Sequence, residues 1–300
     1  MTVSVANVAQ ATEAGWFPSA VEPLPQLLLE PIVRAALLED LGRAGDITTA
    51  AVVPPDARFQ GVIAARRPGV VAGTAAAALA FRLLDAGIEI VLERPDGSAV
   101  AAGDRVMRVS GPARGILSAE RVALNLLCHL SGIATCTAGL VRAVGAHRAR
   151  ITCTRKTTPG LRALEKAAVR AGGGVSHRFG LDDGVLIKDN HIAIAGGVAT
   201  AVARARRAVG HMVKIEVEID DLAQLLAALA GGVDAVLLDN MTPEMLTRAV
   251  AMIGGRAIAE ASGRITEATV PAVAASGVDI ISAGWITHSA PALDLGLDAV

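Results

Sequence analysis

This 300-residue chain has few aromatic residues and almost no net charge. Tyrosine is absent, aromatic residues make up 2% of the sequence, and the formal net charge is -1. Proteins that bind nucleic acid normally use a basic surface and aromatic side chains that stack on bases. The composition therefore argues against nucleic acid as a partner, while a hydrophobic content of 52% predicts a globular chain with a large core.

Cysteine is scarce as well. Cys128, Cys136 and Cys153 are odd in number and lack the spacing of a metal site, a pattern typical of reduced core residues in a cytoplasmic protein. A catalytic Cys153 is the weaker alternative. The first 33 residues contain no lysine or arginine, so the charged start of a secretory signal peptide is missing. We expect residues 1–30 to form a flexible extension.

The chain contains one long stretch without charged residues, Val122–Val141. It contains polar residues such as Asn125 and His129, which fit a buried helix better than a helix that faces lipid. We therefore expect no membrane span, and a long helix from Leu117 to about Val144.

Two patterns of apolar residues divide the rest of the chain. Residues 31–132 contain short strand-like runs around one alanine-rich helix, which predicts an N-terminal α+β domain. The runs are Gln60–Ala65, Ile88–Glu93 and Arg105–Ser110, and the helix is Ala75–Asp85. In residues 133–287 strands alternate with helices, so we expect a parallel sheet of six or seven units that forms an open or incomplete α/β barrel. Its strands are expected at Arg150–Cys153, Gly184–Ile187, Val213–Ile219, Ala235–Leu238, Ala257–Ala259 and Asp279–Ser282.

Polar or small residues follow each strand of the second domain, at the edge where active sites of parallel barrels lie. They are Thr154, Arg155 and Lys156; Lys188, Asp189, Asn190 and His191; Glu218; Asp239 and Asn240; Glu260, Ser262 and Gly263; and Ser282 and Gly284. Loops are polar in any barrel, but six successive endings of this kind favour an active site.

Cationic side chains are concentrated between residues 155 and 191. They are Arg155, Lys156, Arg162, His177, Arg178, Lys188 and His191. Because arginine binds carboxylate or phosphate through two parallel hydrogen bonds and lysine adds a compact charge, this set predicts a site for a small polyanion. We interpret His177 and His191 as binding groups, and His129 and His147 as structural residues without chemical neighbours.

Two carboxylates are candidates for a metal site. Strand alternation in residues 214–219 places Glu216 and Glu218 on one face, which points to the centre of a barrel. Glu218 and Asp239, on neighbouring strands, then predict a Mg²⁺ site. The alternative is that either acid pairs with Lys156 or Lys188.

Two small-residue pairs follow the last two strands. Ser262-Gly263 and Ala283-Gly284 leave room for backbone N–H groups to approach a phosphate. Tight turns alone are the alternative explanation, but the position matches the usual phosphate site of a barrel.

Three motifs resemble those of the quinolinate phosphoribosyltransferase family. They are Thr154-Arg155-Lys156-Thr157-Thr158-Pro159-Gly160, His177-Arg178, and Val185-Leu186-Ile187-Lys188-Asp189-Asn190-His191. The resemblance extends from about Glu39 to the end of the chain. It includes Gly45-Asp46-Ile47-Thr48, Glu120-Arg121-Val122-Ala123-Leu124-Asn125, Glu216-Val217-Glu218 and Leu237-Leu238-Asp239-Asn240.

This resemblance implies a fold and a reaction. The fold is an N-terminal α+β sandwich joined to an incomplete barrel, with residues 288–300 returning to the first domain. The reaction transfers phosphoribose from phosphoribosyl pyrophosphate to quinolinate with loss of CO2, giving nicotinate mononucleotide for NAD synthesis.

The resemblance also implies roles for individual residues. Quinolinate and nearby phosphates would be bound by Arg155, Lys156, His177, Arg178 and Lys188, while Arg121 would come from the second subunit of a homodimer. Lys156, Lys188, Glu218 and Asp239 are then the expected catalytic residues, and Ser262, Gly263, Ala283 and Gly284 the expected phosphate loops. Two residues depart from the family pattern: Arg264 stands where a second glycine is common, and Trp285 is bulkier than expected.

Three alternatives remain open from the residues. The first is a related phosphoribosyltransferase that acts on another aromatic acid, such as nicotinate. The second is a Schiff-base aldolase in which Lys156 or Lys188 attacks a carbonyl. The third is a protein that binds a phosphorylated metabolite without turnover, although the pair Glu218 and Asp239 argues against it.

Overall fold

The computed structural model describes residues 24–300. Most of the predicted extension, residues 1–30, lies outside the described part, but its last residues belong to helix α1 (Gln26–Leu41). The expected boundary at residue 30 is therefore wrong by about five residues. Leu29, Val33 and Leu37 follow one another at helical spacing and are buried, so this segment docks on the domain through one apolar face.

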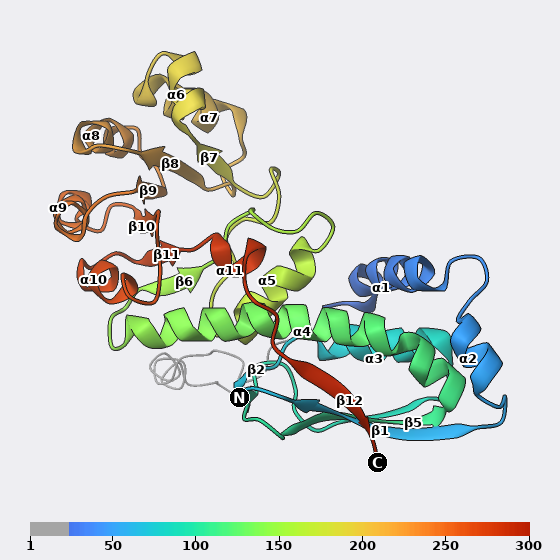
Figure 1. Ribbon diagram of the computed structural model, residues 1–300. Helices are drawn as coiled ribbons and strands as arrows, with labels where there is room; N and C mark the ends of the chain where they lie inside the picture. Colours follow the sequence, from blue (N-terminus) through green and yellow to red (C-terminus); the bar gives the residue numbers. More distant parts are fainter. Residues whose placement is uncertain (1–23) are drawn as a thin grey trace, which may run out of the picture.

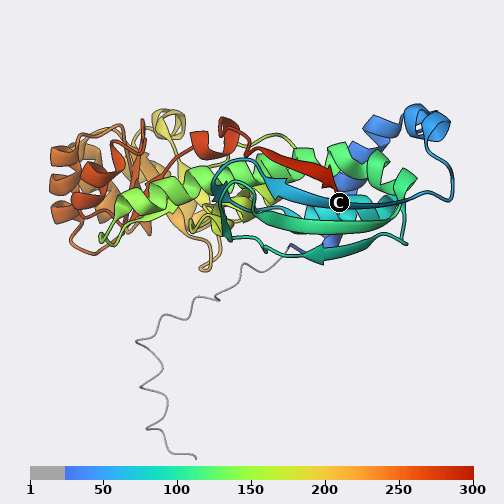
Figure 2. The ribbon, with the colours of Figure 1, turned by 60° about the horizontal axis from the view of Figure 1, so that its bottom comes forward.

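The N-terminal domain is an antiparallel sheet covered by helices (Figures 1 and 2). The sheet has the strand order β12-β1-β5-β3, with β1 at Arg58–Ala65, β3 at Glu89–Leu92, β5 at Arg105–Pro112 and β12 at Leu295–Ala299. A small pair, β2 (Gly69–Val70) and β4 (Ala99–Val100), and the helices α2 (Ile47–Val52) and α3 (Thr74–Leu84) complete the domain. Since β12 pairs with β1, the end of the chain returns to the first domain.

Helix α4 (Ala113–Val144) runs along both domains (Figure 2). It begins four residues earlier than expected, directly after Pro112, and the Ala113 N–H bonds to Ala57 O at 2.9 Å. The helix is long and apolar enough to cross a membrane, but 61% of its most apolar window is buried inside the protein. It is therefore the buried core helix that the sequence predicts.

One glycine of α4 allows the C-terminal segment to cross it. A Cβ atom at Gly132 would lie 2.1 Å from Pro291 O, which is far inside contact distance. The backbone of residues 291–292 consequently rests on α4 at this point, and only glycine permits that approach. The close crossing directs the chain from the second domain back to strand β12.

The C-terminal domain is a six-stranded parallel sheet that does not close, with the order β6-β11-β10-β9-β8-β7. The strands are β6 (Arg150–Thr152), β7 (Val185–Ile187), β8 (Ile215–Ile219), β9 (Ala235–Asp239), β10 (Ile258–Ser262) and β11 (Ile280–Ser282). A single parallel bridge, Thr152 to Val175, lies at the free edge of β6. The predicted incomplete barrel is confirmed, because β6 and β7 are the two unpaired ends of the sheet.

Helices cover the outside of this sheet (Figure 1). They are α5 (Arg162–Ala171), α6 (Asp189–Ala195), α7 (Val198–Ala208), α8 (Leu222–Ala230), α9 (Pro243–Ile253), α10 (Val270–Ala275) and α11 (Trp285–His288). The strand ends that carry polar residues all open to the same side, since the strands are parallel. That side holds the candidate site.

Candidate active site

A cavity of about 370 Å³ lies at the carboxyl ends of the parallel strands. It brings together eight residues that the sequence analysis selected: Arg155, Lys156, His177, Arg178, Lys188, Glu218, Asp239 and Ser262. Thr154, Leu186, Leu237, Glu260 and Ser282 complete its walls. Residues more than 100 positions apart in the sequence thus face one space.

Two guanidinium groups on the cavity wall have no anionic partner. Within residues 24–300, neither Arg155 nor Arg178 takes part in an ion pair, and the buried Arg155 Nε has no hydrogen-bond partner. The Arg178 Nη1 donates to Gly184 O at 2.9 Å. Burial lowers the pKa of Arg178, and the nearby positive charge of Arg155 lowers it further. Such a pair is the arrangement expected of an anion site.

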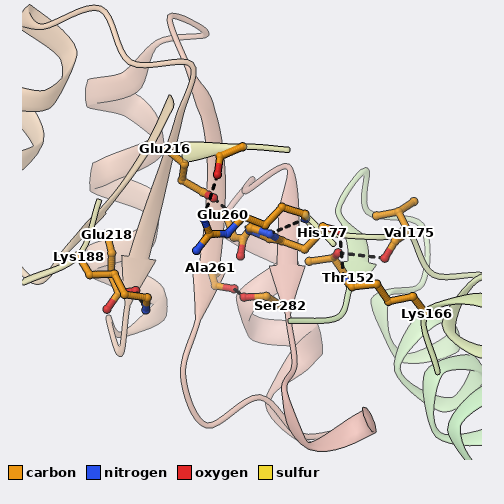
Figure 3. A network of polar contacts seen from close by, with 12 residues as sticks. Thr152, Lys166, Val175, His177, Lys188, Glu216, Glu218, Glu260, Ala261 and Ser282 are labelled. Carbon is orange, nitrogen blue, oxygen red and sulfur yellow. Dashed lines mark hydrogen bonds and ion pairs between the residues drawn. The ribbon is translucent and has the colours of Figure 1, made fainter. Parts of the chain in front are cut away.

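Lys188 and Glu218 lie side by side on the wall of the same cavity (Figure 3). The Lys188 Nζ contacts Glu218 Oε2 directly, so the predicted alternative of an acid paired with Lys188 holds for Glu218. Asp239 forms no ion pair among the described residues, but its Oδ2 accepts a hydrogen bond from Asn240 Nδ2 at 2.6 Å. Glu218 and Asp239 therefore present carboxylate oxygens to one cavity, as Mg²⁺ prefers.

A cluster of three titratable groups, His177, Glu216 and Glu260, lies at one side of the cavity (Figure 3). His177 Nε2 lies 3.0 Å from Glu216 Oε2 and 3.6 Å from Glu260 Oε2. The three ligand atoms lie within 4.8 Å of one another, a spacing that would also suit a metal ion. The sequence analysis placed Glu216 on the inner face of its strand but did not select it, because its partner is 39 residues away.

The pKa values of two groups in this cluster, Glu260 and His177, are raised. Burial and the charge of Glu216 raise the pKa of Glu260 to about 7, and Glu260 Oε1 has no hydrogen-bond partner among residues 24–300. Burial lowers the pKa of His177, but the hydrogen bond with Glu216 and the charge of Glu260 outweigh it. His177 Nδ1, however, accepts the N–H of Arg178 at 2.8 Å, which requires an unprotonated nitrogen there. The shared proton therefore lies among Nε2 and the two carboxylates and belongs to the cluster as a whole.

A second cavity, of about 520 Å³, adjoins the first and shares Lys156, Asp239 and Ser262 with it. The predicted phosphate-loop residues Gly263, Ala283 and Gly284 line it. Gly263 has φ +96°, and a Cβ there would lie 2.3 Å from Asn240 Oδ1. The loop therefore requires glycine at this position.

The two departures from the expected pattern lie in this second cavity. Arg264 adopts φ 52°, a left-handed conformation that favours glycine. Trp285 donates from its Nε1 to Ile265 O at 2.8 Å. This hydrogen bond attaches the Trp285 side chain to the loop that contains Arg264.

Comparisons with known proteins agree with this arrangement. A sequence profile described as quinolinate phosphoribosyl transferase, C-terminal domain, matches residues 133–298, and the profile of the N-terminal domain matches residues 46–131. The chain belongs to the quinolinate phosphoribosyltransferase family. The resemblance inferred from the motifs is confirmed, and it covers both domains.

Individual relatives of the family match over most of their length. The chain is 44% identical over 272 residues to a probable nicotinate-nucleotide pyrophosphorylase (carboxylating) of Bacillus subtilis, covering 91% of this chain and 93% of that one. It is 45% identical over 271 residues to the nicotinate-nucleotide pyrophosphorylase (carboxylating) of Mycobacterium leprae, covering 89% and 95%. The solved nicotinate-nucleotide pyrophosphorylase of Francisella tularensis superposes with a TM-score of 0.89 at 37% identity, covering 95% of this chain and all of that one.

Three cationic residues of the predicted set lie outside both cavities. Arg121 is on α4 with 74% of its side chain exposed, and it reaches neither cavity of its own chain. Arg162 bonds to protein oxygens, and His191 Nδ1 accepts the N–H of Lys188 at 3.0 Å. Neither Arg162 nor His191 lines a cavity, so the structure does not place them in the predicted anion site.

His129 also differs from its interpretation. It lies beside the fully buried Glu165, with 2.9 Å between His129 Nε2 and Glu165 Oε1, so it does have a chemical neighbour. Glu165 and the adjacent Lys166 were not selected from the sequence. The available signal was their position beside Leu164 and Ala168 on the apolar side of a short helix.

Proposed function

We propose that this protein is an enzyme that transfers phosphoribose from phosphoribosyl pyrophosphate to the ring nitrogen of quinolinate. The products are nicotinate mononucleotide, pyrophosphate and CO2, in the de novo synthesis of NAD. The observation that carries this proposal is the pair of unpaired guanidinium groups in the first cavity, next to a second cavity with a glycine-dependent loop.

The first cavity would bind quinolinate through its two carboxylates. Arg155 and Arg178 are the main partners, because each offers several donors in one plane and neither forms an ion pair with a carboxylate of the described residues. Lys188 and His177 line the same cavity. Nicotinate has one carboxylate less and would leave part of this positive charge uncompensated, at a cost of about 2 kcal/mol or more.

The second cavity would bind the phosphates of phosphoribosyl pyrophosphate. Ser262-Gly263 and Ala283-Gly284 supply backbone groups at the ends of neighbouring strands. Lys156 lines both cavities. It is thus placed to neutralise the leaving pyrophosphate while quinolinate occupies the adjoining space.

Glu218 and Asp239 would hold Mg²⁺, since both carboxylates line the first cavity and Asp239 also lines the adjoining phosphate cavity, and carboxylate oxygens are donors that this ion prefers. Bound Mg²⁺ would neutralise charge on the pyrophosphate. The same carboxylates favour the positive charge that develops on the ribose as the pyrophosphate leaves. Lys188 holds the side chain of Glu218 in position for this role.

The second half of the reaction needs no protein nucleophile. Once the ring nitrogen carries ribose, the C2–carboxylate bond breaks and its electron pair remains at C2, stabilised by the positive nitrogen, until a proton replaces CO2. Arg155 and Arg178 would hold the ring in place and shield it from water during this step.

The working unit would be a homodimer in the cytoplasm. Arg121 is exposed and reaches neither cavity of its own chain, so the proposed role requires a second subunit. The three free cysteines agree with a reducing compartment. Light scattering of the purified protein tests the dimer.

A turnover assay tests the reaction itself. Purified protein is mixed with Mg²⁺, phosphoribosyl pyrophosphate and either quinolinate or nicotinate, and mononucleotide and CO2 are followed by mass spectrometry. Mononucleotide and CO2 from quinolinate alone are expected. Product from nicotinate instead would support the related transferase, and no product from either would lead to borohydride trapping at Lys156 or Lys188 as a test for an aldolase.

A further inference from the structure

Helix α5 carries two charged residues, Glu165 and Lys166, whose side chains are fully buried. Neither lines a cavity. The helix lies between two stretches of chain: the Arg155 segment (residues 154–160) and the Arg178 segment (residues 176–184). Burying a charge is costly unless hydrogen bonds compensate for it, so the partners of these side chains indicate their purpose.

Glu165 and Arg162 bind the Arg155 segment. Glu165 Oε2 accepts the backbone N–H of Thr158 at 3.2 Å, and its other oxygen lies 2.9 Å from His129 on α4. Arg162 Nε donates to Thr157 Oγ1 at 3.0 Å. The segment is therefore attached to α5 at two successive residues.

Lys166 and Arg162 bind the Arg178 segment. Lys166 Nζ donates to His177 O at 3.0 Å and to Cys153 Sγ at 3.2 Å, and it lies 5.1 Å from the centre of the Phe179 ring. Figure 3 shows Lys166 below His177. Arg162 Nη1 donates to Phe179 O at 3.0 Å. One guanidinium thus bonds to both segments.

We propose that Arg162, Glu165 and Lys166 form a clamp that sets the separation of Arg155 and Arg178, and so selects a dicarboxylate substrate. The clamp residues are positioning residues, and this role rests on the proposed function. Arg155 and Arg178 repel each other when no anion is bound, and no carboxylate of the described chain pairs with either. The clamp bonds attach the two segments that carry these guanidiniums to one helix, against that repulsion.

The clamp acts on the quinolinate side of the site alone. Glu218 lies in β8 and Asp239 in β9, and the two glycines follow β10 and β11. None of the clamp bonds runs to these strands. The backbone of Lys156 has a separate anchor, since Thr287 Oγ1 donates to Lys156 O at 2.8 Å. Loosening the clamp should therefore affect quinolinate and spare phosphoribosyl pyrophosphate.

The variant Arg162→Ala tests the clamp, because Arg162 is only partly buried and its loss should leave the fold intact. We expect the KM for quinolinate to rise about 10- to 100-fold, with the KM for phosphoribosyl pyrophosphate nearly unchanged. Arg162→Lys should recover part of the loss. Equal changes in both constants, or no change in either, would overturn the proposal.

Arg206→Ala is the matched control. Arg206 also donates to one carbonyl, Gly232 O at 2.6 Å, and to one side chain, Asp234 Oδ2 at 3.1 Å, but both partners belong to a single loop at the opposite end of the barrel. A comparable change in melting temperature for both arginine variants, with a rise in the quinolinate KM for Arg162→Ala alone, is the expected result. The same rise in Arg206→Ala would mean that general loosening of the barrel explains the effect.

A double-mutant cycle with Thr157→Val examines one bond of the clamp. Valine keeps the shape of threonine but cannot accept the hydrogen bond from Arg162 Nε. If the bond positions Arg155, the effects of Thr157→Val and Arg162→Ala on the quinolinate KM are less than additive. Fully additive effects would contradict it.

Hydrogen exchange separates failure of the clamp from failure of the proposed function. Peptides that cover residues 154–160 and 176–184 should exchange faster in Arg162→Ala than in the wild type, whatever the substrate is. Unchanged exchange in both peptides would overturn the clamp, even if quinolinate is the substrate. Faster exchange in a protein that uses nicotinate would retain the clamp and reject the substrate.

Discussion

The two ends of the barrel differ in how their charges are paired. The cavity at the amino ends of the strands has a volume of about 570 Å³, larger than either of the two cavities at the carboxyl ends, of about 370 and 520 Å³. At the amino ends, Arg148 pairs with Asp279 at 3.1 Å and Lys214 with Asp234 at 2.9 Å. At the carboxyl ends, the guanidinium of Arg155 retains a buried nitrogen without a partner.

This difference shows that volume does not identify the site. Charges that already have partners hold the barrel together, whereas charges held close together without partners are available to a ligand. Each prediction below alters one end of the barrel.

The largest effect is expected from removing both carboxylates at the carboxyl ends. The double variant Glu218→Ala, Asp239→Ala should lower kcat by at least about a thousandfold, because it removes the charges that face the ribose and the pyrophosphate. Quinolinate should still bind, since Lys188 is released from its contact with Glu218. Calorimetry measures binding and the turnover assay measures kcat. Loss of binding together with turnover would contradict the separate roles of these groups.

Removing one unpaired guanidinium should have the next largest effect. Arg178→Ala should raise the KM for quinolinate about 10- to 100-fold, the loss expected for one or two hydrogen bonds to a charged group. Arg148→Ala at the amino ends breaks the exposed pair with Asp279 and should leave that KM unchanged. Similar KM values for the two variants would remove the distinction between the ends.

The two ends should also respond to pH in opposite directions. The pKa of Glu260 is about 7 in the folded chain and near 4.5 when unfolded, so between these values the folded state holds a proton that the unfolded state lacks. The free energy of unfolding then falls as pH rises from about 4.5 to 7, by on the order of a few kcal/mol. Glu260→Gln should remove this fall, as urea unfolding at pH 5 and pH 8 can measure.

Asp234 provides the opposite case at the amino ends. Burial raises its pKa, but hydrogen bonds from Ile215 N–H, Lys214 and Arg206 lower it more, so the net pKa is below the usual value. Its contribution to stability is present at neutral pH and is lost as pH falls through the folded pKa. Asp234→Asn should therefore destabilise the protein at pH 7 and have no effect in strong acid. A constant difference across pH would contradict this assignment.

The smallest effect concerns backbone conformation. Arg264 at the carboxyl ends has φ 52°, while Gly254 and Gly255 occupy the positive-φ turn at the amino ends. Arg264→Gly should relieve about 1 kcal/mol of backbone strain in the folded state. Glycine also gives the unfolded chain more conformational freedom, which lowers the free energy of unfolding by slightly less than that amount. Thermal unfolding should show a small gain in stability. A clear loss would indicate that the Arg264 side chain contributes contacts that outweigh the strain.

Much of the architecture was predictable because it depends on local periodicity. Short apolar runs between helical stretches located five of the six barrel strands to within about two residues, and the small residues at the ends of β10 and β11 line one cavity. Strand β10 extends to Ser262, three residues beyond its predicted end at Ala259. Its last residues, Glu260 and Ser262, are polar, so apolar periodicity gave no sign that the strand continued.

The sequence alone determined the alternation of strands and helices, the family and the residues at the strand ends, since each of these is written in neighbouring positions. Only the tertiary structure decided which charges are paired. Arg162 and Arg178 look alike in the sequence, but Arg162 bonds to Thr157 and Phe179 while Arg178 faces the cavity. Pairing depends on contacts between segments that are distant in the sequence, such as the contact between His177 and Glu216. The local sequence around either residue does not indicate such contacts.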